Sequence, residues 1–448
     1  MNRENKMGYK PMGKLLIEMS LPIMLSMFIQ ALYNIVDSRF VSQINENAFT
    51  AVSIALPIQN LMIGVGVGAG VGVNALLSRS LGEKNNRQAN LAAENGFFLC
   101  IIHSIVFVLF GLFLSRIYYS MQTTNIAVIN YGSEYISICT IFSIGIFTQI
   151  MTERILQSTG RTIIAMISQI IGAVINIILD PIFIFGLFNV PAFGVKGAAI
   201  ATVIGQVLGA IIAVTLNYKY NADVEIKRIF PDINTIRKIY IIGVPSMILI
   251  AIGSVAIYLL NGILDRFSTT AVAALGAYFK VQSFIFMPIF GLTNGMVPVL
   301  AYNYGAGNSE RAKKVVDLSL KSGILFMTFG FLIFQIFPKQ LLGIFNASDK
   351  LIEIGVPMLR IISTAFMMAG YNIVSGSTFQ ALGNGMLSLM SSVVRQLLVL
   401  LPVAYIFAAM GNLTLVWCSY PIAEIADFLF CKYYLKNFAI NKIESLNY

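Results

Sequence analysis

Apolar and polar positions alternate in long blocks along this chain, with extended apolar stretches separated by short polar connections. An apolar run of about 20 residues is long enough for a helix to cross the hydrocarbon core of a bilayer. We therefore predict an all-α membrane protein, and we expect those helices that exceed this length to tilt. The twelve predicted helices lie near residues 15–42, 50–78, 93–119, 128–158, 162–188, 196–217, 238–264, 270–303, 316–337, 352–381, 385–410 and 412–434.

Composition supports this class. Charged residues make up 11% of the chain and hydrophobic residues 57%, whereas a soluble domain carries about 25% charged residues. The first apolar stretch is too long for the core of a signal peptide, and no small-residue cleavage site follows it. The four cysteines are scattered through apolar segments without metal or disulfide spacing, which indicates small packing residues.

The second half of the chain repeats the first in a constant register. The register holds without a gap through the fourth helix, and past the fifth it slips by five, so that 197–206 aligns with 415–424. Because six helices separate equivalent positions, both halves have the same orientation about an axis along the membrane normal. This predicts two pseudo-symmetric six-helix bundles, an architecture suited to alternating access. The paired identities include Pro22 with Pro245, Gln59 with Gln282, Gly68 with Gly291, Gly82 with Gly305, and Gly160 with Gly383.

From the repeat we predict four regions: an N-terminal lobe (1–216), a cytoplasmic linker (217–239), a C-terminal lobe (240–434) and a cytoplasmic tail (435–448). Lysine and arginine concentrate in the connections on the side of the N-terminus, for example 79–87, 219–238 and 311–314. This bias predicts that both termini are cytoplasmic and that the protein spans the plasma (inner) membrane. It also accounts for the net charge of +10 without a nucleic-acid partner. Nothing in the sequence requires an oligomer, so we expect a monomer in the lipid bilayer.

Sequence signals for an enzyme or a nucleotide-driven motor are weak. No G-x-x-x-x-G-K-[ST] stretch is present. The glycine-rich segment 63–77 lies inside a predicted helix, where glycines every four residues favour close helix packing. The single histidine, His103, stands in an apolar run without a metal cluster or nucleophile near it in sequence. We therefore predict neither enzyme activity nor a cofactor.

Two acids inside predicted helices are the main candidates for function, because ionisable groups at membrane depth are costly and usually face a cavity or a partner. Asp37 ends a polar stripe at helical spacing, and Asp180 lies one turn after Asn176. In the repeat, Asp37 aligns with Leu260 and Asp180 with Val403, so the scaffold is duplicated but the acids are not. A single ion site in the N-terminal half is the functional interpretation, and a hydrogen bond that only holds helices together is the structural alternative. The other members of the stripe are Gln30, Tyr33 and Asn34.

Candidates for a substrate cavity are Gln59 and its repeat partner Gln282, together with Lys280 and Arg395 in the C-terminal half. The two cations could instead reach the membrane surface or pair with acids. The many methionines and phenylalanines pack helices or face lipid, and adaptable surfaces of this kind also suit a promiscuous cavity.

The chain resembles the multidrug and toxic compound extrusion (MATE) transporters over nearly its whole length. The resemblance implies twelve helices in two lobes and export of organic cations in exchange for H⁺ or Na⁺. In one prokaryotic branch it implies a cation site at Asp37, Asn176, Asp180 and Thr202. Another branch adds acids in helices 7 and 10, but here helix 7 has none and helix 10 has only Glu353 near its start, so the resemblance does not support an acidic cation site in the C-terminal lobe. The stretches that carry the resemblance are LPIMLSMFIQALYNIVDSRFV (21–41), LQSTGRT (156–162), NIILDPIFIFG (176–186), GVKGAAIATVIGQ (194–206) and PVLAYNYGAGN (298–308).

The favoured hypothesis is a secondary active antiporter that exports cationic amphipathic drugs and works by alternating access. Two close carboxylates in a low-dielectric site need a proton or a cation, and Na⁺ at Asp37, Asn176 and Asp180 fits as well as H⁺. The main alternative is a flippase or exporter of lipid-linked precursors or polysaccharides, whose cavity should be cationic; Lys280, Arg360 and Arg395 keep it open. The two-bundle repeat argues against a cation channel.

Overall fold

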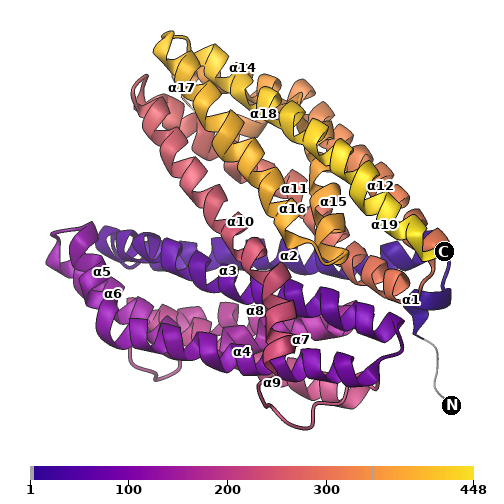
Figure 1. The fold of residues 1–448 in the computed structure, drawn as a ribbon. Coiled ribbons are helices and arrows are strands. Elements are labelled where there is room, and N and C mark those ends of the chain that lie inside the picture. The colour runs from indigo at the N-terminus through magenta and orange to yellow at the C-terminus, as the bar shows by residue number, and fades with distance from the viewer. Residues whose placement is uncertain (1–4, 345–347, 448) are drawn as a thin grey trace. The chain divides into compact units, whose positions relative to one another are not determined.

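The computed structural model describes residues 5–344 and 348–447, and within these ranges the chain is helical without a β-strand (Figure 1). Within the same ranges, ten helices are long and apolar enough to cross a membrane, and two bent helix pairs each supply one further span. The predicted all-α class and the twelve predicted spans are thereby confirmed, and the protein is a multi-pass membrane protein.

Among the described residues, the first half of the chain contains nine α-helices and one π-helical turn. The bend in its fourth span separates α6 from α7 by 47°. The elements are α1 (Lys6–Tyr9), α2 (Met12–Ser42), α3 (Glu46–Gly82), α4 (Asn86–Leu109), η1 (Phe110–Leu114), α5 (Ser115–Gln122), α6 (Ile126–Ile141), α7 (Ile144–Ser158), α8 (Thr162–Phe185) and α9 (Val195–Tyr220).

The second half follows the same order, with a bend of 52° between α14 and α15. A π-helical segment of eight residues, η2, interrupts the eleventh span of the chain, which is the fifth span of this half. The elements are α10 (Ile233–Asp265), α11 (Thr269–Gly305), α12 (Ser309–Ile336), α13 (Pro338–Gly343), α14 (Asp349–Ser363), α15 (Phe366–Ala381), α16 (Gly385–Ser392), η2 (Val393–Leu400), α17 (Leu401–Ala409), α18 (Leu413–Tyr434), η3 (Leu435–Ile440), α19 (Asn441–Glu444) and η4 (Ser445–Asn447).

By packing, the chain divides into two compact units, Leu25–Gly243 and Met1–Met24 with Val244–Tyr448. We call them the N-unit and the C-unit. The repeat led us to assign all of 1–216 to one lobe, whereas the segment that ends at Met24 packs with the C-unit. Ser20 shows this, because its hydroxyl donates to the carbonyl oxygen of Leu292 at 3.3 Å. Of the predicted linker 217–239, only residues 221–232 are irregular, because α9 continues to Tyr220 and α10 begins at Ile233. The described part of the predicted tail continues as the short helical segments η3, α19 and η4.

The duplication extends to individual helix ends. α3 and α11 begin and end at positions that the repeat makes equivalent, and the starts of α6 and α14 and of α8 and α16 are equivalent in the same register. Gly160 and Gly383, which precede the last pair, have φ angles of 84° and 85°, a left-handed conformation that glycine adopts without steric cost. The repeated sequence therefore builds the same backbone turn twice.

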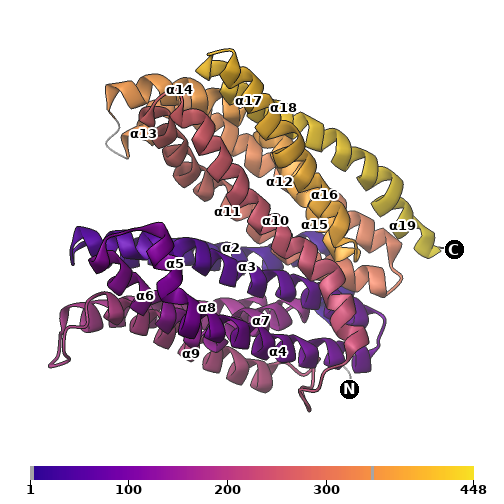
Figure 2. The same ribbon diagram turned by 60° about the vertical axis from the view of Figure 1, so that its left-hand side comes forward.

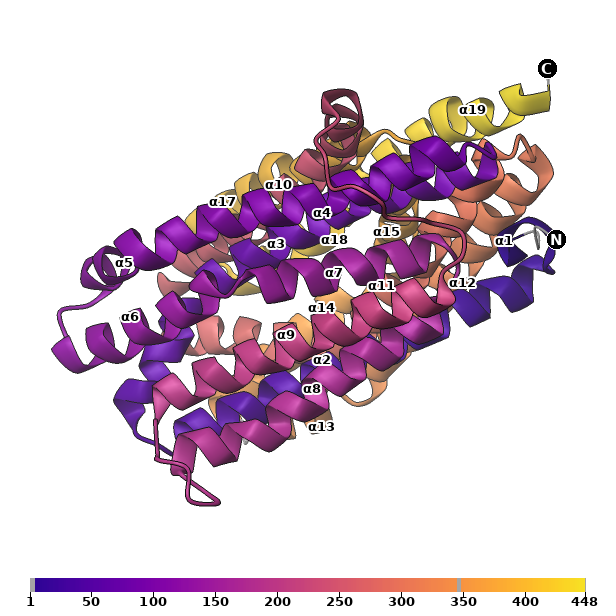
Figure 3. The same cartoon turned by 90° about the horizontal axis from the view of Figure 1, so that it is seen from below.

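Each unit has its own packing core. In the N-unit the helices α3 to α9 lie alongside one another, and α8 and α9 are neighbours along their length (Figures 2 and 3). In the C-unit, α11, α12, α14, α15 and α18 surround buried aromatic side chains, of which the largest is Trp417, the single tryptophan of the chain.

Candidate functional site

The polar stripe predicted on the first span lies on α2 in the N-unit. Tyr33 and Asp37 are half-buried, whereas Gln30 and Asn34 are exposed. The side-chain amide of Gln169 on α8 donates to Gln30 at 3.4 Å. The stripe therefore touches α8 at Gln30, and its half-buried members are Tyr33 and Asp37.

α8 supplies the two most deeply placed polar groups of the site. Asn176 and Asp180 are 3% and 0% exposed and lie one helical turn apart, on the buried face. Pro181 follows directly, and its ring cannot donate the usual backbone hydrogen bond. Beyond it α8 ends at Gly186, whose φ of 76° closes the helix.

Small residues let α9 approach α8 closely at this depth. A Cβ atom added to Gly205 would lie 2.9 Å from the carbonyl oxygen of Gly172 and 3.0 Å from Cβ of Asn176. Contacts this short leave room only for hydrogen at that position. The approach places Thr202, which is 4% exposed, beside Asn176.

The amide of Asn176 connects the two helices. Its nitrogen lies 3.4 Å from Oδ1 of Asp180 and 3.3 Å from Oγ1 of Thr202. Both of its groups are satisfied in the orientation in which the nitrogen donates to Oδ2 of Asp180 and the oxygen accepts from the backbone N–H of Thr202, each at 3.1 Å. Either orientation holds Asp180, Asn176 and Thr202 in one hydrogen-bonded group.

Asp37 joins this group from α2, because its carboxyl group lies close enough to that of Asp180 for the two to interact directly. The oxygen Oδ1 of Asp37 is buried and has no hydrogen-bond partner among the described residues. Neither acid forms a salt bridge within the part of the chain that the structure describes. Two carboxyl groups in contact in a low-dielectric environment require a shared proton or a cation. The structure thus brings together all four residues predicted to form the ion site.

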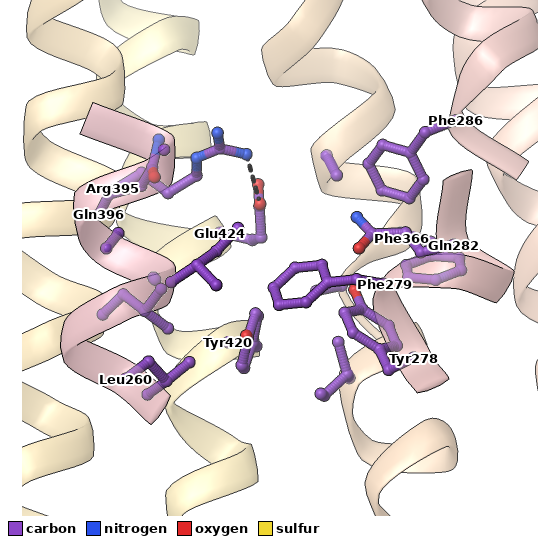
Figure 4. Close-up of a pocket in the computed structure, with 18 of the residues that line it drawn as sticks. Leu260, Tyr278, Phe279, Gln282, Phe286, Phe366, Arg395, Gln396, Tyr420 and Glu424 are labelled. Carbon is purple, nitrogen blue, oxygen red and sulfur yellow. Dashed lines mark hydrogen bonds and ion pairs between the residues drawn. The ribbon is translucent and has the colours of Figure 1, made fainter. Parts of the chain in front are cut away.

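The residues predicted to line a substrate cavity lie in different places. In the N-unit, Gln59 donates to the hydroxyl of Tyr135 at 3.1 Å. In the C-unit, Gln282 and Arg395 line a cavity of about 300 Å³ (Figure 4). Lys280 is exposed on α11 and is not among the lining residues.

Two acids of the C-unit were missed by the sequence analysis. On α18, Glu424 accepts a hydrogen bond from Arg395 at 3.0 Å, and Asp427 is 2% exposed and accepts from the hydroxyl of Ser391 at 2.6 Å. The resemblance directed attention to helices 7 and 10, and both acids lie on the last span. The signal was present as two acids three positions apart in the apolar segment 421–430.

Comparison with known proteins gives a consistent picture. The MatE family model matches residues 22–182 and 244–406, one stretch in each half of the chain. Multidrug export protein MepA of Staphylococcus aureus (strain bovine RF122 / ET3-1) is 26% identical over 92% of this chain and 91% of its own length. A protein of Shewanella oneidensis named FAD transporter is also 26% identical, over 94% of both chains.

Among solved structures, a MATE crystallised in complex with MaD5 aligns with a TM-score of 0.90 and 24% identity, covering 100% of this chain and 99% of that one. At this identity the likeness concerns the fold, which is the two-lobe arrangement of twelve helices predicted from the repeat.

Proposed function

The chain belongs to the MatE family, and from that premise we propose that it is a secondary active antiporter that exports cationic amphipathic compounds in exchange for H⁺ or Na⁺. The observation that carries the proposal is the contact between Asp37 and Asp180 beside Asn176 and Thr202, deep in the N-unit. Carboxylates without a salt bridge at membrane depth are costly, and binding a cation there offsets the cost.

The coupling step follows from electrostatics. A proton or Na⁺ arriving from outside neutralises the pair formed by Asp37 and Asp180. Without that cation the carboxylates repel each other, so α2 and α8 have different preferred packings in the loaded and empty states. Each elementary charge that crosses the membrane supplies about 2.3 kcal/mol per 100 mV. Loading of the site would thereby drive release of the exported compound on the outer side.

The remaining residues set the selectivity of the site for its ion. Asn176 holds the carboxyl of Asp180, and Thr202 adds a hydroxyl or backbone oxygen. Oxygen ligands suit Na⁺, and a buried carboxyl suits H⁺ equally well. The half-buried Tyr33 interacts electrostatically with both acids.

The alternative of a flippase or exporter of lipid-linked precursors loses part of its support. Of the three cations that kept it open, Arg395 is paired with Glu424, and a pyrophosphate group would have to displace that acid. The relative named FAD transporter is as similar to this chain as MepA is, so homology alone does not choose the charge of the substrate. The local excess of acids in both units favours a cation.

The test is efflux of ethidium from proteoliposomes under an imposed pH or Na⁺ gradient, with Asp180→Asn compared to the unaltered protein. We expect one of the gradients to accelerate efflux and thereby to identify the ion. In Asp180→Asn the acceleration should be lost while ethidium binding to the purified protein is retained.

Glu83→Gln is the matched control, because it removes one carboxylate from an exposed pair with Arg79 at the end of α3. It should leave the acceleration intact. Unchanged gradient-driven efflux in Asp180→Asn would refute the coupling role and return Asp180 to a structural one.

A further inference from the structure

The cavity of about 300 Å³ in the C-unit lies outside the group of residues proposed for ion coupling (Figure 4). Helices α10, α11, α15 and α18 and the π-helical η2 contribute to its wall. Arg395, Gln396 and Leu260 lie on one side, the rings of Phe279 and Phe286 lie opposite, and Glu424 stands between them. A volume of this size is at the lower end of small-molecule sites. The aromatic lining residues are Tyr278, Phe279, Phe286, Phe366 and Tyr420.

The repeat relates this cavity to the polar stripe of the N-unit. The register that pairs Gln59 with Gln282 also pairs the four residues of the stripe with four positions on α10, and all four line the cavity. Gln282 itself lines it as well. The cavity therefore occupies the place in its scaffold where the N-unit carries its polar stripe. The four positions on α10 are Gly253, Ala256, Ile257 and Leu260.

The charges of the described residues at the cavity do not balance. Arg395 donates to one oxygen of Glu424 at 3.0 Å, and the amide of Asn372 donates to the other at 2.8 Å. Asp427, one turn further along α18, does not line the cavity, but its buried carboxyl group interacts electrostatically with Arg395. One guanidinium therefore faces two acids, and a ligand with a positive charge corrects the imbalance.

The backbone around Arg395 also differs from a regular helix. Arg395, Gln396 and Leu400 all belong to η2, and π-helical turns are frequent at functional sites. At the repeat position of Arg395 the N-unit has Gly172, where α8 and α9 pack with backbone in contact. The C-unit thus has the long cationic side chain of Arg395 at the position where Gly172 lets two helices of the N-unit pack in direct contact.

From these observations, and on the basis of the proposed export of organic cations, we propose that the cavity binds the planar aromatic part of such a cation, with Glu424 as its counter-ion and Arg395 as a tethered competitor that occupies Glu424 when the cavity is empty. Aromatic faces attract cations, most strongly in a desolvated site. The hydroxyl of Tyr420, buried and without a partner among the described residues, is available to the ligand.

A tethered competitor makes the two partners of the ion pair act in opposite directions. Removing the charge of Glu424 deprives a bound cation of its counter-ion and weakens binding. Removing Arg395 frees Glu424 and strengthens binding. A salt bridge with only a structural role predicts loss of binding, or no change, in both variants.

The chain contains a suitable reporter, because its single tryptophan, Trp417, lies on α18 on the same helical face as Tyr420 and Glu424. Trp417 is 1% exposed and packs in the same buried cluster as Tyr278 and Phe366, two of the lining residues. Berberine is a planar aromatic cation whose absorption overlaps tryptophan emission. Its binding in the cavity should quench Trp417 by energy transfer.

The experiment is a titration of the purified full-length protein with berberine, with no gradient present. We expect saturable quenching, a Kd about tenfold higher in Glu424→Gln and about tenfold lower in Arg395→Met, the factors that correspond to one charge-assisted contact. Lys321→Met removes an exposed positive charge from α12 of the same unit and should leave the Kd unchanged. A Kd that moves in the same direction in both cavity variants, or in neither, overturns the inference.

The double variant Arg395→Met/Glu424→Gln keeps the test valid if Glu424→Gln folds poorly. It removes both charges of the ion pair and therefore leaves no buried charge without a partner. Its Kd should be well above that of Arg395→Met, and an equal Kd overturns the inference. The outcome is separate from that of the efflux assay: opposite shifts without gradient-driven efflux refute the antiporter proposal alone, and efflux without opposite shifts refutes the cavity alone.

Discussion

The N-unit and the C-unit contain the same succession of helices but differ in chemistry where the fifth and sixth spans of each half meet. In the N-unit, Gly172 and Gly205 allow α8 and α9 to touch, and Asn176, Asp180 and Thr202 form a compact hydrogen-bonded group. In the C-unit the repeat positions of those two glycines are Arg395 and Ala423, and a cavity lies beside them.

This difference shows which features a duplicated membrane scaffold keeps. Helix ends, bends and left-handed glycines recur in the same register because they determine whether the helices can pack at all. Side chains facing the interior of each unit are free to diverge once the backbone is stable. Under the roles proposed above, one copy carries a pair of acids that would hold a small ion, and the other carries an aromatic cavity that would take a larger cation.

The largest effect is expected when an acid of the N-unit is replaced by the residue that the C-unit has at the equivalent position. In Asp37→Leu the N-unit carries the residue that the C-unit has at Leu260. Asp180 then lacks its partner, and we expect gradient-driven efflux to fall by about 100-fold or more, which corresponds to about 2.7 kcal/mol. The measurement is ethidium efflux from proteoliposomes under the gradient that drives the unaltered protein.

The reciprocal change tests whether the units are interchangeable. Adding Leu260→Asp to Asp37→Leu moves the acid to the equivalent position in the wall of the C-unit cavity. The repeat positions of Asn176 and Asp180 are Val399 and Val403 there, so the acid has neither of its N-unit partners. Efflux should stay at the level of Asp37→Leu. Recovery in the double variant would mean that either unit can hold the coupling ion, contrary to the division of roles proposed here.

Helix packing is the next largest difference. Gly205→Ala gains about 1 kcal/mol of helix propensity but places a methyl group against the carbonyl of Gly172 and Cβ of Asn176, neither of which can swing away. Overpacking of this kind costs about 1–3 kcal/mol, so the strain should win. We expect a lower melting temperature and weaker ion coupling, measured by thermal unfolding in detergent and by efflux.

The matched change in the C-unit is Ala423→Gly, which removes a methyl group at the position equivalent to Gly205. It should cost about 1 kcal/mol through helix propensity alone. If Gly205→Ala were as well tolerated as this control, the close approach of α8 and α9 would not be required for the position of Asn176.

Local signals in the sequence are enough to predict the spans, because the length of an apolar run is visible without knowledge of the fold. An acid in an apolar helix, such as Asp37 or Asp180, stands out for the same reason. The contact of Gly172 with Gly205 could not be predicted, because it depends on how two helices cross. The pair of Arg395 with Glu424 could not be predicted either, because the two residues are 29 positions apart and meet only through packing.

The π-helical η2 had no warning in sequence. Its residues, 393–400, are apolar apart from Arg395 and Gln396 and continue the helical pattern on either side. A π-helix adds a residue per turn and thereby rotates the face that the following residues present. The predicted span 385–410 was therefore confirmed as an element, while the orientation of Arg395 in it depended on a backbone irregularity that only the structure reveals.

Single hydroxyl groups offer a finer comparison. Thr202 and Tyr420 are equivalent in the shifted register of the last spans. The hydroxyl of Thr202 lies 3.3 Å from the Asn176 amide, whereas that of Tyr420 has no partner among the described residues. Thr202→Val should raise the ion concentration for half-maximal efflux about fivefold, the equivalent of about 1 kcal/mol, and Thr202→Ser should restore it.

In contrast, Tyr420→Phe removes a buried hydroxyl group that makes no hydrogen bond to the described residues. Such a change is expected to leave the melting temperature unchanged or raise it slightly. A marked loss of stability in ligand-free Tyr420→Phe would show that the hydroxyl has a structural role and that the two positions are more alike than the geometry indicates.

The smallest expected effect is one in which the units should not differ. Asn45 caps α3 by accepting from the backbone N–H of Ala48 at 2.8 Å, and Ser268 caps α11 by accepting from that of Ala271 at 3.1 Å. Asn45→Ala and Ser268→Ala should each cost about 1 kcal/mol. The exchanges Asn45→Ser and Ser268→Asn should be close to neutral, because both side chains accept the same bond. Thermal unfolding of the four variants checks this, and a large effect at one cap alone would mean that the duplicated scaffold is not equally stable in its two copies. Equal effects would place the functional asymmetry in the interior side chains rather than in the helices that hold them.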